Sequence, residues 1–173
     1  MKKISLIDED FMDFPIGEFP YDKNHSAIGE YHFIHFPGFY GRWYDPVCNY
    51  RYNGQGASWC IMEYNGRHYM EQMRLHNTEP HRTFPTLETG DRFWRDYDIE
   101  AGLRMFNTKW GSAGIGFCAQ NSLNLLACIF EDKKLKLVYR HKENVEEIKS
   151  VDFDYNCDDT YNIKVSVKGN HVI

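Results

Sequence analysis

The sequence predicts an all-β protein that folds as an antiparallel β-sandwich or jelly roll. Apolar and polar residues alternate with period two in several segments, turn residues recur at short intervals, and no long segment has a helical period. Aromatic residues make up 16% of the chain, and such side chains pack well on a pleated surface. The 173 residues are expected to form one domain that spans 1–173.

The clearest predicted strand runs over residues 94–106. Ile99 and Leu103 alternate with Asp98, Glu100 and Arg104, so that one face is apolar and the other polar. A helix would mix the two sets around its circumference. The apolar set is therefore predicted to face the core.

The remaining predicted strands follow the same pattern. Residues 59–64 and 67–75 form a predicted hairpin around Asn65-Gly66, which is a strong short turn signal. Further strands are predicted near 112–119, 123–130, 134–139 and 163–168, with connections at 121–122, 132–133 and 152–159. The residues predicted to be largely buried are Ile99, Leu103, Ile115, Phe117, Leu125, Leu137 and Val165.

Charge and composition indicate which partners to expect. The net charge is −5, whereas binding to a phosphate backbone requires a basic surface, so no nucleic acid partner is expected. The sequence contains no apolar run of membrane-spanning length, so no membrane partner is expected either. The first residues become acidic too early for a signal peptide. A cytoplasmic location is therefore expected.

The cysteine pattern favours free thiols. The chain has an odd number of cysteines and no C-x-x-C pair, and Cys118 and Cys128 lie within apolar runs. This is typical of buried free thiols in a reducing compartment. The five cysteines are Cys48, Cys60, Cys118, Cys128 and Cys157.

The second half of the chain resembles a known family of sandwiches. The residues that carry the resemblance are Trp94-Arg95-Asp96-Tyr97-Asp98-Ile99-Glu100-Ala101, then Gly114-Ile115-Gly116-Phe117, then Tyr161–Val165 and Gly169-Asn170. This order resembles the concanavalin A-like lectin and glucanase sandwiches, in particular the laminin-G-like and 3-keto-disaccharide-hydrolase-like jelly rolls. The resemblance covers about residues 90–170. It implies carbohydrate handling.

Two departures from the family pattern limit what the resemblance implies. Further strands usually follow the Gly-Asn turn, whereas this chain stops at Ile173, so the chain is expected to be a fragment or the N-terminal module of a longer protein. The paired acids of laminarinase-type enzymes, E-x-D-x-x-E, are absent from the sequence. The resemblance therefore carries over no catalytic set.

No cofactor is predicted, apart from the structural calcium ion that jelly rolls often hold. By the resemblance, Asp8, Asp10 or Asp13 would pair with Asp158 or Asp159; a solvated acidic turn is the alternative. The sequence lacks the glycine and the last glutamate of an EF-hand loop. The spacing of the histidines predicts no zinc site.

Aromatic residues in the N-terminal half form the predicted sugar site. Sugar rings stack on flat aromatic rings while their hydroxyl groups seek polar side chains. Five residues supply both kinds of group: Arg42, Trp43, Tyr44, Asp45 and Trp59. The alternative is that these rings close the ends of the sandwich core.

Carboxylates on predicted strands are the candidates for catalysis. Glycoside hydrolysis needs two carboxyl groups about 5 to 10 Å apart. Asp98 and Glu100 share one face of their strand. Glu63 and Glu71 lie on the two strands of the predicted hairpin, where they could oppose each other. Acids on the outer face of a strand are usually solvated, which is the alternative.

These features lead to three functional hypotheses. The first is a noncatalytic module that binds an oligosaccharide or polysaccharide, or serves as an accessory to a carbohydrate-active protein. The second is a glycoside hydrolase that uses paired carboxylates. The third is a structural module that interacts with a partner domain or with further copies of itself.

Overall fold

The computed structural model describes residues 4–19, 43, 59–72, 86–91, 93–106, 111–121, 123–142, 144–157 and 159–173. The chain divides into two compact units, Met1–Asp91 and Arg92–Ile173. Within the described residues every regular element is a strand and none is a helix. The all-β prediction is therefore confirmed. A single domain over 1–173 stays a prediction.

The described residues of the first unit form one antiparallel sheet of three strands in the order β1-β2-β3. The strands are β1 (Gly17–Phe19), β2 (Trp59–Tyr64) and β3 (Arg67–Gln72). The predicted hairpin is confirmed, because β2 pairs with β3 through a turn at Asn65 (φ 53°) and Gly66 (φ 72°). Two successive residues with positive φ match the right-handed twist of the strands.

A small apolar cluster supports this sheet. Phe14 and Ile61 are 3% and 1% exposed and form its centre. The half-buried residues packed against them are Phe11, Trp43, Trp59, Met70 and Leu87. Some of the many aromatic residues of the N-terminal half are thus core residues.

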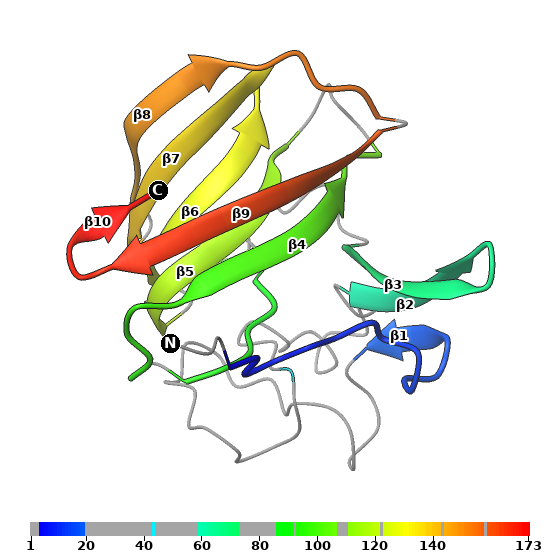
Figure 1. Cartoon of the computed structure of the whole chain (residues 1–173). Coiled ribbons are helices and arrows are strands. Elements are labelled where there is room, and N and C mark those ends of the chain that lie inside the picture. Colours follow the sequence, from blue (N-terminus) through cyan, green and yellow to red (C-terminus); the bar gives the residue numbers. More distant parts are fainter. Residues whose placement is uncertain are drawn as a thin grey trace. The chain divides into compact units, whose positions relative to one another are not determined.

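The second unit contains two antiparallel sheets. One has the order β10-β9-β4 and the other β5-β6-β7-β8. Their strands are β4 (Asp98–Arg104), β5 (Ala113–Asn121), β6 (Asn124–Glu131), β7 (Lys134–His141), β8 (Asn144–Asp152), β9 (Thr160–Lys168) and β10 (His171–Val172). In Figure 1 the ribbons of β4 and β9 lie across the four-stranded sheet.

The two sheets of the second unit share one core. Val165 on β9 is packed in the same buried cluster as Phe117 on β5 and Phe130 on β6, so the sheets pack face to face as a sandwich. Buried positions were predicted correctly for Ile115, Phe117, Leu125 and Val165, whereas Ile99, Leu103 and Leu137 are half-buried against the core. The face predicted for β4 is also confirmed, because Ile99 and Leu103 point inward while Asp98 and Glu100 are exposed.

One expectation about the cysteines is wrong. Cys118 was expected to be buried, but its side chain is exposed. The pairing of β5 with β6 shifts register between Phe117 and Asn121, and Cys118 has a φ of 52°. Buried and exposed residues alternate through this part of β5, with Ile115 and Phe117 buried and Gly116 and Cys118 exposed. The thiol therefore lies at one of the exposed positions of the strand. The cysteines of the described residues, Cys60, Cys118, Cys128 and Cys157, are free thiols, and Cys48 lies outside that part of the chain.

Tyr155, in the connection between β8 and β9, is buried in the sandwich core with an unsatisfied polar atom. Its side chain is 0% exposed, and its hydroxyl group is buried without a hydrogen-bond partner among the described residues. A buried hydroxyl without a partner costs about 1 to 3 kcal/mol. The ring itself packs on Phe130, with centroids 5.3 Å apart, so the ring is stabilising while the hydroxyl is not.

We expect Tyr155→Phe to raise the free energy of unfolding by about 1 kcal/mol, because it removes the unsatisfied hydroxyl and keeps the ring. Tyr161→Phe is the matched control. Its hydroxyl accepts a hydrogen bond from the Asn156 backbone N–H (2.9 Å) and lies 3.2 Å from Asp159 Oδ2, so this change should lower stability. Urea unfolding of both variants measures the difference. A loss of stability in Tyr155→Phe would contradict the assignment.

Candidate functional site

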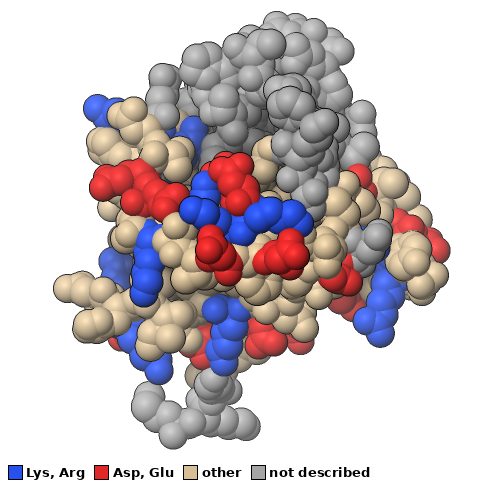
Figure 2. Space-filling view, turned by 90° about the horizontal axis from the view of Figure 1, so that it is seen from above, with Lys and Arg blue, Asp and Glu red and all other residues tan. Residues whose placement is uncertain are grey.

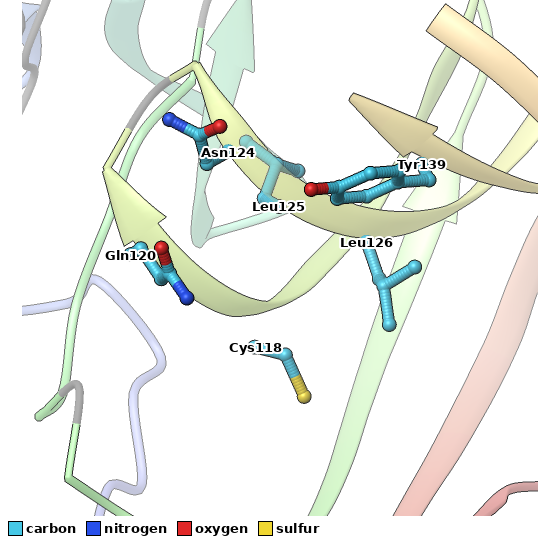
Figure 3. Close-up of a pocket in the computed structure, with 6 residues that line it drawn as sticks. All are labelled: Cys118, Gln120, Asn124, Leu125, Leu126 and Tyr139. Carbon is cyan, nitrogen blue, oxygen red and sulfur yellow. The ribbon is translucent and has the colours of Figure 1, made fainter. Parts of the chain in front are cut away.

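A shallow pocket lies in the second unit where the sandwich core ends. It has a volume of about 180 Å³ and is lined by Cys118, Gln120, Asn124, Leu125, Leu126 and Tyr139. Figure 3 shows that β5, β6 and β7 each contribute to it, with the hydroxyl end of Tyr139 pointing toward the side where Asn124 lies. The β5 bulge creates the pocket, because it carries Cys118 and Gln120 away from the regular ladder.

Tyr97 fixes the bulge in place. Its hydroxyl oxygen accepts a hydrogen bond from the backbone N–H of Cys118 at 2.9 Å, and it lies 3.7 Å from the Cys118 Sγ atom. Burial raises the pKa of Tyr97 to about 12, so the phenol is neutral at ordinary pH. The bulge therefore does not depend on a charged group.

Tyr139 provides an accessible aromatic ring. It lies on β7 directly opposite Leu126 of β6 and Glu146 of β8, and residues opposite each other share a face of the sheet. Leu126 packs against the sandwich core, so this is the inner face. Tyr139 is nevertheless 38% exposed, which shows that the core packing stops before it.

A row of hydrogen-bonding side chains borders the ring. The ladder pairs Asn121 with Asn124, Asn124 with His141, and His141 with Asn144. These four residues, named here the polar row, cross all four strands of the sheet. The Tyr139 Oη and His141 Nδ1 atoms are 3.4 Å apart, and the two rings stack with centroids 6.0 Å apart.

Asn121 orders the β5–β6 end of the row. Its Oδ1 atom accepts hydrogen bonds from the Leu123 backbone N–H (2.9 Å) and from Asn124 Nδ2 (2.8 Å). The second bond fixes the Asn124 amide with its nitrogen toward Asn121. Within the described residues, the Asn124 carbonyl oxygen and the Gln120 amide make no hydrogen bond, so they are available to a ligand.

The pocket carries no formal charge. None of its lining residues is a carboxylate, lysine or arginine. Charged side chains of the second unit form ion pairs away from the pocket. Lys136 Nζ, for example, lies 2.8 Å from Glu131 Oε2 and 3.1 Å from Asp132 Oδ2. Hydrogen bonding to Glu131 raises the pKa of Lys136. Figure 2 shows both signs interspersed on the face that it displays, so no single sign dominates there.

The predicted sugar residues of the N-terminal half have structural contacts. Trp43 is half-buried, and its Nε1–H donates a hydrogen bond to Glu9 Oε2 at 2.9 Å while its ring lies 5.5 Å from that of Phe11. Trp59 packs on the same cluster, with its Nε1 atom buried and without a partner among the described residues. Arg42, Tyr44 and Asp45 lie outside the described residues. Sugar binding by this set stays a prediction.

The hairpin acids are not brought together by the structure. The register pairs Glu63 with His68 and Glu71 with Cys60, so the two glutamates lie three rungs apart and on opposite faces. The expectation that Glu63 and Glu71 oppose each other is therefore wrong, because the tight turn fixes a different register.

The acids of β4 share a face as predicted, but that face is open to solvent. Both side chains are exposed. The Ser166 hydroxyl donates to Asp98 Oδ1 at 2.7 Å, and Glu100 lies opposite Lys164. An exposed strand face does not exclude water from a reacting bond, so this arrangement does not favour hydrolysis.

The calcium candidates are spread over the chain. Asp13 belongs to the first unit and Asp159 to the second, and Asp158 lies outside the described residues. Asp159 Oδ2 lies 3.2 Å from both Asn156 Nδ2 and the Tyr161 hydroxyl. Among the described residues no group of three or more His, Cys, Asp or Glu side chains could hold a metal ion. A structural calcium stays a prediction.

The sequence interpretation missed the Tyr139 pocket and the polar row, although a signal was present. Asn121 and Asn124 flank one two-residue turn, and His141 and Asn144 flank another. In an antiparallel meander alternate turns lie at the same end of the sheet. Polar residues at the bases of both turns therefore predict a shared polar edge.

Comparisons with known proteins identify no relative of the chain: no protein-family model, no curated protein and no solved structure matches it. In the described part of the chain no helix is long and apolar enough to cross a membrane.

Proposed function

We propose that the chain is a noncatalytic carbohydrate-binding module with a concanavalin A-like jelly-roll fold. The observation that carries the proposal is the pocket at Tyr139, which combines an accessible aromatic ring with two side-chain amides and no charged group. An aromatic ring stacks on the apolar face of a sugar, and amides exchange hydrogen bonds with hydroxyl groups. The resemblance of residues 90–170 to lectin-like sandwiches supports the same function.

The lining of the pocket argues for binding without hydrolysis. A glycosidase needs two carboxyl groups on either side of the scissile bond, and the pocket lining contains none. The dissociation constant of such a site is expected to lie between about 1 mM and 1 μM, or roughly −4 to −8 kcal/mol.

Tyr139→Ala tests the proposal. We expect it to weaken sugar binding by about 1 to 3 kcal/mol, because the stacked apolar area is lost. That corresponds to about 5-fold to 140-fold in affinity. Since the ring is 38% exposed, the melting temperature should change little. Titration calorimetry against neutral oligosaccharides measures the affinity, and thermal unfolding measures the stability.

Tyr64→Ala is the matched control, because Tyr64 is 62% exposed and lies at the end of β2 in the other unit. It should leave sugar binding unchanged. A chain that binds no member of a broad glycan array, or that binds equally well after Tyr139→Ala, would contradict the proposed function.

A further inference from the structure

The polar row extends well beyond the pocket. Asn124 on β6 lines the pocket and Asn121 on β5 pairs with it, whereas His141 on β7 and Asn144 on β8 continue the row to the edge of the sheet. Neighbouring strands are about 4.8 Å apart, so the row spans roughly 14 Å. The pocket of about 180 Å³ is smaller than the roughly 300 Å³ at which sites for drug-sized ligands begin. The pocket thus accommodates one ring, and the row is longer than one ring.

The inner face of the four-stranded sheet becomes more accessible from β5 toward β8. Phe117 is 3% exposed and Leu126 is half-buried, whereas Tyr139 is 38% exposed and both His141 and Asn144 are exposed. Within the described residues the Asn144 side chain makes no hydrogen bond. A ligand seated in the pocket therefore has an open polar surface beside it on β7 and β8.

The chemistry of this surface suits hydroxyl groups. The row consists of three amides and one imidazole, so it offers both hydrogen-bond donors and hydrogen-bond acceptors. Hydroxyl groups of a sugar chain both donate and accept. A peptide strand would pair with the backbone at the outer edge of β8. The row instead lies on the face of the sheet and crosses all four strands, so a ligand that follows it contacts side chains and not the backbone of one edge.

The charge of the surface excludes anionic chains. Neither the pocket nor the row contains lysine or arginine, which phosphate or uronate chains would require. Glu146 lies directly opposite Tyr139 on β8 and is exposed, so it repels anions beside the ring.

We infer that the ligand is a neutral oligosaccharide of at least three sugar units that runs perpendicular to β5–β8, with one unit in the Tyr139 pocket and the following units over His141 and Asn144. This inference rests on the proposed function and adds the length, direction and charge class of the ligand.

The experiment is calorimetry with cello-, manno- and xylo-oligosaccharide series, each from the monosaccharide to the hexasaccharide. For the series that binds, affinity should rise at least about tenfold from one unit to three and then level off. Asn144→Ala should lower the affinity for the trisaccharide about fivefold or more and leave that for the monosaccharide unchanged. Gln120→Ala should lower both, because Gln120 lines the pocket itself.

Asn162→Ala is the control, because Asn162 is an exposed asparagine on β9 outside the row; it should change neither affinity. Equal affinity for one and three units, with no effect of Asn144→Ala, would overturn the inference and leave the proposed function standing. Absence of binding by the unaltered chain to every member of every series would overturn both. Tighter binding of galacturonate oligomers than of neutral chains would overturn the charge class alone.

Discussion

Gly114→Ala is expected to destabilise the second unit by about 3 kcal/mol or more, at the upper end of the cost of overpacking. A Cβ atom on Gly114 would overlap the Cys128 carbonyl oxygen and would lie 2.7 Å from the Ile129 Cα atom. Both atoms are backbone of β6, the partner of β5. Backbone atoms in a ladder cannot rotate away as a side chain can, so the two strands would have to separate.

Gly102→Ala is the matched control for this prediction. Gly102 also lies within a strand, but the nearest atoms to its Cβ would be side-chain atoms, Thr160 Cγ2 at 3.3 Å and Asn162 Oδ1 at 3.4 Å. The free energy of unfolding of the Gly102→Ala variant should be unchanged or rise by up to about 1 kcal/mol, because alanine restricts the conformations of the unfolded chain. Urea unfolding measures the stability of both variants, and an unchanged m-value shows that only stability has changed. A similar small effect at both positions would show that β5 and β6 do not approach so closely.

Strands with regular alternation could be predicted from the sequence, whereas irregular strands could not. β4 and β9 alternate over their whole length, and their inward faces follow from period two. β8 was missed because its pairing with β7 shifts register between Leu137 and Val138, opposite Glu147 and Lys149. Residue 148 is an extra residue in β8, so the side chains before it and after it follow opposite alternations between the two faces. No single alternation of apolar and polar residues is therefore visible in the sequence.

The position of the Tyr139 pocket depends on how the strands pair, which no sequence motif indicates. Tyr139 comes next to Leu126 and Glu146 only through two ladder registers, and the pocket exists because β5 bulges after Phe117. The sequence interpretation placed the sugar site around Trp43 because aromatic and charged residues are dense there. In the structure the Trp43 ring packs at a tilt against Phe11, in the cluster around Phe14 and Ile61. Aromatic density alone does not separate stacking surfaces from small cores.

Phe117→Ala is expected to cost about 3 to 5 kcal/mol of unfolding free energy, the usual cost of removing a buried aromatic ring. Phe117 is 3% exposed and lies in the cluster that joins β5 and β6 to β9. Truncation leaves a cavity between the two sheets, which rigid ladders on both sides cannot fill.

Cys118, the residue after Phe117, provides the matched control for this prediction. Because the Cys118 side chain is exposed, Cys118→Ala should change the free energy of unfolding by no more than about 0.5 kcal/mol. Both cysteine and alanine carry a Cβ atom, so the strain of the positive φ at this position (52°) is common to the wild type and the variant and cancels. Thermal and urea unfolding of the two single variants compare the sites directly. If Cys118→Ala cost as much as Phe117→Ala, Cys118 would be a buried core residue, and its exposed position beside the Tyr139 pocket would be wrong.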